Sequence, residues 1–101
     1  MNKKSLPFSS ISVLGTLVKV KMLGRLPGKW GEYEEAKSLI TLLNGPKEKV
    51  ERTLIHEVVH HWQYTCGRPL EEAEATALEL FVWDFIKNNK AAVKWIMRQR
   101  W

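Results

Sequence analysis

The chain has 101 residues, 45% of them hydrophobic and 27% charged, which allows one domain with a thin core. Its net charge of +5 would suit an acidic partner, but the basic residues are dispersed and no nucleic-acid-binding motif is present. The single cysteine, Cys66, excludes an intrachain disulfide, and no apolar run approaches the roughly 18 residues of a membrane span. We therefore predict one domain over residues 1–101 of a cytoplasmic protein that has no membrane partner.

The first part of the chain has the pattern of β-strands. Apolar residues alternate with Lys19 and Lys21, a possible bend lies at Gly15, and residues 24–31 are rich in glycine and form a predicted loop. The strands predicted from this pattern cover residues 11–23 (one or two strands), 32–35 and 38–43.

The second part has the pattern of three helices, over residues 46–65, 69–87 and 90–100. Pro46 suits a first helical position, whereas Gly67 and Pro69 mark a turn between the first two helices. The third helix is basic and amphipathic, and we expect it to pack on the domain or on a partner. The element order predicts an α+β fold, with a small antiparallel or mixed sheet of about three strands packed on the first helix.

The strongest functional signal lies inside the first predicted helix, where residues 56–60 read His-Glu-Val-Val-His. Residues four positions apart lie about 40° apart around a helix, so His56 and His60 can bind one zinc ion from the same face. Glu57, about 100° further round, can reach a metal-activated water and act as general base. Two polar histidines on an amphipathic helix are the plainer alternative.

A catalytic zinc site needs a third protein ligand and one open position. The long metzincin motif does not fit, because Gln63 and Cys66 stand where its glycine and third histidine would be. Cys66 could bind zinc but nothing else supports it, and we expect His61 to be exposed or to face substrate. The remaining candidates are the carboxylates of the second predicted helix: Glu71, Glu72, Glu74 and Glu79.

Helical periodicity favours Glu74 among these carboxylates. The residues that define an apolar face of the second helix are Leu70, Leu78, Phe81 and Phe85. Glu74 falls near the centre of that face, where a carboxylate is costly unless it is paired or bound to metal. Glu72 and Glu79 fall on the opposite side, where a solvated surface is the ordinary expectation.

Along most of its length the chain resembles small phage and bacterial zincin-like (gluzincin) proteins, which are often grouped with the ImmA/IrrE and SprT-like metallopeptidases. The segments that carry the resemblance are residues 13–15, Gly31, residues 52–60, residues 70–72, residues 88–90, Val93 and residues 95–96. The resemblance implies a minimal zincin-like fold and a third ligand on the helix after the active-site helix, at Glu72. It also implies that an edge strand above the cleft pairs with extended substrate, for which residues 35–43 are the candidate.

We therefore predict a zinc-dependent metallopeptidase that binds Zn²⁺ through His56, His60 and Glu72, with Glu74 and Glu79 as alternatives to Glu72. Glu57 would be the general base in hydrolysis of a protein or peptide substrate, in a bacterial or phage-infected cell. The oxyanion donor is left open among Tyr33, His61 and Tyr64. The alternative function is a zincin-fold binding or inhibitory protein without peptidase activity. A nucleic-acid partner would rest on charge alone.

Overall fold

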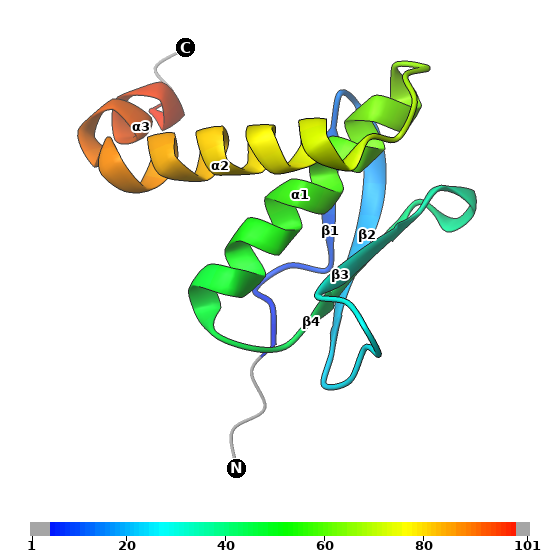
Figure 1. The fold of residues 1–101 in the computed structure, drawn as a ribbon. Coiled ribbons are helices and arrows are strands. Elements are labelled where there is room, and N and C mark those ends of the chain that lie inside the picture. The colour runs from blue at the N-terminus through cyan, green and yellow to red at the C-terminus, as the bar shows by residue number, and fades with distance from the viewer. Residues whose placement is uncertain (1–4, 99–101) are drawn as a thin grey trace.

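Four strands form one mixed sheet in the computed structural model, which describes residues 5–98 (Figure 1). The strands are β1 (Ser10–Val13), β2 (Thr16–Leu23), β3 (Gly31–Glu34) and β4 (Leu39–Leu43). Their order across the sheet is β1-β2-β4-β3, with β2 and β4 parallel and the two outer pairs antiparallel. The predicted α+β class is confirmed, with four strands where about three were expected.

The position of β4 changes one prediction. β4 pairs with β2 on one side and with β3 on the other, so it lies inside the sheet and has no free edge. The expectation that residues 35–43 provide an edge strand for substrate is therefore wrong. The edge strand on this side of the sheet is β3, which is joined to β4 by a short 3₁₀ turn, Glu35–Lys37.

The core lies on one face of the two parallel strands. Alternation in β2 buries Val18 and Val20 while Lys19 and Lys21 stay exposed, and β4 buries Ile40 and Leu42 on the same face. The predicted bend at Gly15 is real, because this residue has a φ of 79° in the turn between β1 and β2. The side chains that pack this core from the long first helix are Val50, Leu54 and Val58.

Three helices follow the sheet: α1 (Lys47–Thr65), α2 (Glu72–Asn88) and α3 (Lys90–Met97). α1 begins at Lys47, one residue later than predicted, because Pro46 precedes the helix with a ψ of 138°. α2 begins three residues later than predicted, because the backbone at Glu71 is still extended. The end of the predicted third helix, residues 99 and 100, lies outside the described residues. No helix within residues 5–98 is long and apolar enough to cross a membrane.

α2 packs on α1 along one face, and its second half still reaches α1 through Trp83, which lies beside Arg52, and through Lys87, which pairs with Glu51. The buried residues of α2 are Ala75 and Glu79, whereas Phe81 is 67% exposed. The apolar face predicted for this helix is therefore not the face that packs. In α3 the side chain of Trp95 is 72% exposed, so an apolar surface continues onto that helix.

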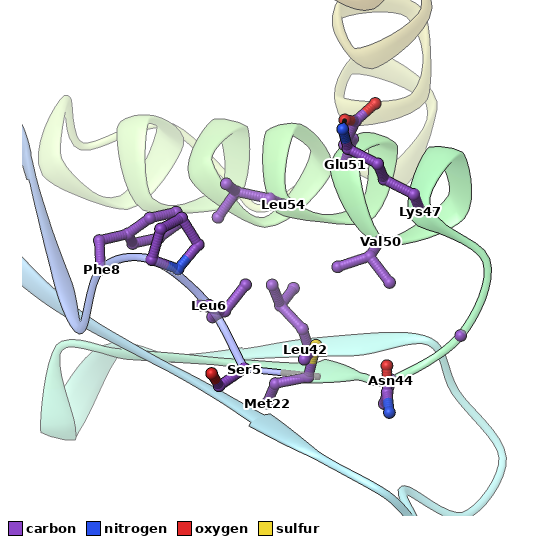
Figure 2. A pocket seen from close by; sticks show the side chains of 12 residues that line it. Ser5, Leu6, Phe8, Met22, Leu42, Asn44, Lys47, Val50, Glu51 and Leu54 are labelled. Atoms are coloured by element: carbon purple, nitrogen blue, oxygen red, sulfur yellow. Dashed lines mark ion pairs between the residues drawn. The ribbon is translucent and has the colours of Figure 1, made fainter. Parts of the chain in front are cut away.

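An apolar pocket of about 330 Å³ lies beside the N-terminal half of α1, between this helix, the sheet and the segment that precedes β1 (Figure 2). Its apolar lining includes Leu6, Phe8, Met22, Leu42, Val50 and Leu54. None of the residues predicted to bind metal lines this pocket, so it is separate from the candidate site.

Candidate metal centre

α1 and α2 bring together two histidines and one glutamate. The Nε2 atom of His56 lies 2.7 Å from Oε1 of Glu72, and Nε2 of His60 lies 3.1 Å from Oε2 of the same carboxylate. The two imidazoles are stacked edge to face, with centroids 4.9 Å apart, as expected for positions four residues apart on a helix. One potential ligand atom from each of the three residues lies within 4.8 Å of the others.

The structure places Glu72 beside Nε2 of both histidines, Glu79 beside Nδ1 of His56 alone, and Glu74 beside neither histidine. Glu72 is the first residue of α2, directly after Glu71, whose extended backbone is bonded to Gln63 of α1. Glu74 bonds to Gln63 and to Arg68, away from both histidines. Burial alone would raise the pKa of Glu72, but its hydrogen bonds to His56 and the charges of both histidines bring that pKa below the usual value of 4.5.

Each histidine is also held at its second ring nitrogen. Nδ1 of His56 lies 3.1 Å from Oε1 of Glu79, whose other oxygen accepts a 2.8 Å hydrogen bond from Nε of Arg52. Nδ1 of His60 lies 2.8 Å from Oε1 of Gln63. Carboxylate and amide oxygens can only accept, so each Nδ1 carries a proton. A ring that also carries a proton on Nε2 can donate it to Glu72, and a neutral ring would offer the lone pair of Nε2 to a metal ion.

This donor set fits a zinc ion chemically. Two neutral imidazole nitrogens and a carboxylate, with a fourth position for water, are ligands found in catalytic zinc sites. Two ligand atoms on a tetrahedral zinc lie about 3.3 Å apart, given metal–ligand distances of about 2.0 Å. The separations of 2.7 and 3.1 Å between the histidines and the two oxygens of Glu72 are close to that value.

Glu57 is buried between α1 and the edge strand β3. Desolvation raises the pKa of its carboxyl above 4.5, more than the neighbouring histidines lower it. Gly31, the first residue of β3, approaches this side chain so closely that a Cβ there would lie 3.3 Å from Cγ and from Oε2 of Glu57. A carboxylate with a raised pKa is a better proton acceptor near neutral pH than an ordinary glutamate.

A cleft of about 410 Å³ opens beside these residues. It is lined by Lys29, Trp30, Gly31, Lys49, Arg52, Thr53, His56, Glu57, Glu72, Thr76 and Glu79. The side chain of Glu72 is 79% exposed, whereas those of His56 and His60 are 16% and 8% exposed. The group of potential ligands can therefore be reached from solvent on its Glu72 side.

The structure corrects the expectation for His61, which is buried rather than exposed. Its Nδ1 lies 2.9 Å from the hydroxyl of Tyr33 on β3, and its Nε2 lies 3.4 Å from the hydroxyl of Thr65. Burial lowers the pKa of His61 below 6.5. His61 therefore holds β3 against α1, and Tyr64 is the most exposed of the three residues considered as oxyanion donors.

Sequence reasoning missed Arg52 and Gln63 as partners in this site. Gln63 lies on the same helical face as His60, three residues later, and this spacing is the signal that could have revealed it. Arg52 lies one turn before His56, but its link to that histidine runs through Glu79 on another helix. No pattern within α1 could have shown that link.

Searches of protein-family models, curated proteins and solved structures find no match to this chain. The resemblance to zincin-like metallopeptidases therefore stays a prediction, and any assignment of function depends on the chemistry of the residues described above.

Proposed function

We propose that the chain is a zinc-dependent metallopeptidase. The observation that carries the proposal is that the carboxylate of Glu72 lies 2.7 Å and 3.1 Å from Nε2 of His56 and His60, with buried Glu57 on the same helix. His56, His60 and Glu72 would hold Zn²⁺. A peptide bond of a protein or peptide substrate would be hydrolysed in the adjoining cleft.

Each residue has a separate task in this proposal. When bound, zinc supplies Lewis acidity, which lowers the pKa of a water molecule and polarises the carbonyl of the bond to be cleaved. Glu57 would accept a proton from the attacking water and return it to the leaving amine. The raised pKa of Glu57 supports this role, because the carboxyl must accept and release a proton in one cycle.

Strand β3 is the best-placed element to hold an extended substrate. It lies at the edge of the sheet, its first residue borders the cleft, and its neighbour on the other side is β4. A peptide pairing with β3 would add a strand to the sheet and lie across Glu57, because Gly31 contacts that side chain.

The central experiment compares the wild-type protein with Glu57→Gln and His56→Ala. Zinc content is measured by elemental analysis, and cleavage of unfolded protein substrates is measured with and without a chelator. We expect Glu57→Gln to retain zinc and lose turnover, and His56→Ala to lose zinc. Equal turnover in Glu57→Gln and the wild type would refute the assignment of the base, and full zinc content in His56→Ala would refute the ligand.

A binding or inhibitory protein without peptidase activity is the second candidate. The observation that favours it is the apolar surface on the second half of α2 and on α3, where Phe81, Trp95 and Ile96 are exposed. Surfaces of this kind often contact other proteins. The binding function would be favoured over the peptidase if the zinc-loaded wild-type protein, assayed without chelator, cleaved none of the unfolded protein substrates.

A further inference from the structure

We infer that Gln63 positions two of the three proposed zinc ligands at once, an inference that rests on the proposed metal site. Gln63 lies on α1, one turn after His60, and its side chain is fully buried. Uncharged polar side chains are rarely buried to this extent unless all their hydrogen-bonding groups have partners. Every such group of Gln63 has one.

One half of the Gln63 amide holds His60. Its Oε1 atom lies 2.8 Å from Nδ1 of His60, and the same oxygen accepts a 3.3 Å hydrogen bond from the backbone N–H of Glu71. Because this oxygen cannot donate, the proton between Gln63 and His60 belongs to the imidazole. Gln63 therefore keeps the proton of a neutral His60 on Nδ1, which would leave the lone pair of Nε2 for a metal ion bound beside Glu72.

The other half of the amide holds the segment that leads into α2. Its Nε2 atom donates to the backbone carbonyl of Glu71 at 3.1 Å and to Oε1 of Glu74 at 2.8 Å. Both backbone polar groups of Glu71 are thus bound to one side chain, and the next residue in the chain is Glu72. Arg68 supports the arrangement from outside, because its Nη2 donates to Oε2 of Glu74 at 2.6 Å.

These contacts require a glutamine. A glutamate could accept from His60, but it could not donate to Glu71 or Glu74, and it would face the carboxylate of Glu74. A methionine of similar size would leave the buried polar groups of His60 and Glu71 without a partner. His56 has no equivalent, since its partner Glu79 bonds to Arg52 rather than to the backbone next to a ligand.

The test measures zinc affinity by competition with a chromophoric chelator, for folded wild type, Gln63→Met and Val18→Ala. Val18 lies in the sheet core, so Val18→Ala is a control for lost stability at a distance from the site. We expect the zinc Kd of Gln63→Met to rise by about 10–100-fold, and that of Val18→Ala to stay unchanged. The visible spectrum of the Co²⁺ forms should change for Gln63→Met only, because the orientation of His60 is altered.

A second pair of variants keeps the test decisive if Gln63→Met does not fold. Glu74→Ala removes the acceptor for Nε2 of Gln63, whereas Glu74→Gln can keep an oxygen there. We expect weaker zinc binding for Glu74→Ala and near-normal binding for Glu74→Gln.

The outcomes separate the two proposals. A wild-type protein that takes up no zinc would overturn the metal site, and with it the proposed function. Two results would overturn the role of Gln63 alone, provided that the wild type binds zinc. The first is an unchanged zinc Kd in folded Gln63→Met. The second, which applies if Gln63→Met does not fold, is an equal zinc Kd for the two Glu74 variants.

Discussion

The approach of β3 to α1 at Gly31 leads to a prediction that is independent of function. A Cβ at this position would overlap Cγ2 of Thr53 and lie 3.3 Å from Glu57. Gly31→Ala must therefore move β3 away from the helix or displace Thr53. Overpacking of this kind costs about 1–3 kcal/mol in the free energy of unfolding. In a domain of about this size, each 1 kcal/mol lowers Tm by roughly 4–8 °C.

The assay is equilibrium unfolding in urea, with Gly24→Ala as a matched control. No atom lies within 4 Å of a Cβ at Gly24, so this variant should be neutral, or more stable by about 0.4–1 kcal/mol because alanine restricts the unfolded chain. Thr53→Ser removes the overlapping methyl and keeps the hydroxyl that donates to the carbonyl of Lys49. It should therefore restore part of the stability lost in Gly31→Ala. Equal stability of the two alanine variants, or purely additive effects with Thr53→Ser, would refute the reasoning.

Three further predictions concern the candidate site. Glu79→Ala removes the acceptor for Nδ1 of His56, so the zinc Kd should rise by about 10–100-fold, and it should rise less for Glu79→Gln. Equal zinc Kd values for the wild type and Glu79→Ala, measured by chelator competition, would contradict this role of Glu79. An NMR titration should give His61 a pKa below 6.5, because it is buried. The folded protein then binds this proton less readily than the unfolded chain, so the contribution of His61 to stability is complete above pH 6.5 and is lost as the pH falls below it; a midpoint at or above 6.5 would refute the prediction. Zinc at 100 times its Kd should add about 2.7 kcal/mol to the free energy of unfolding, and a chelator should remove it; a Tm that responds to neither would argue against a metal site.

Local patterns predicted the elements well because their causes are local. Val18 and Val20 alternate with lysines, and this alternation is the signature of a strand with one buried face. The His-Glu-Val-Val-His motif falls inside α1, where helical spacing alone brings His56 and His60 together. The order of the strands is different, because it depends on contacts between distant segments. Nothing in residues 38–43 shows that β3 pairs outside β4, so the edge strand was misidentified.

The choice between Glu72 and Glu74 shows where periodicity misleads. The argument for Glu74 assumed that the apolar face of α2 is its buried face. α2 contacts α1 along the stripe of Ala75, Glu79 and Trp83. Phe81 and Phe85 are exposed because they lie on the other side of the helix, about 200° from that stripe. The face that packs includes Glu79, which is buried because its charge is paired with Arg52. A pattern of apolar residues cannot show such a charged contact, and the family resemblance that favoured Glu72 used different information.

The proposed ligands and Gln63 all come from α1 and α2, whereas β3 and the loop before it contribute one wall of the cleft through Gly31 and Trp30. In the proposed metallopeptidase, the metal ligands would therefore lie only on the two helices, and part of the wall that meets the substrate would come from outside them. Variation in the loop before β3 would alter this wall, whereas β3 itself is tied to α1 by the close approach of Gly31 and by the contact between Tyr33 and His61. Protein engineers seeking a new specificity would randomise that loop, and those transplanting the metal centre would move the helical hairpin as one block.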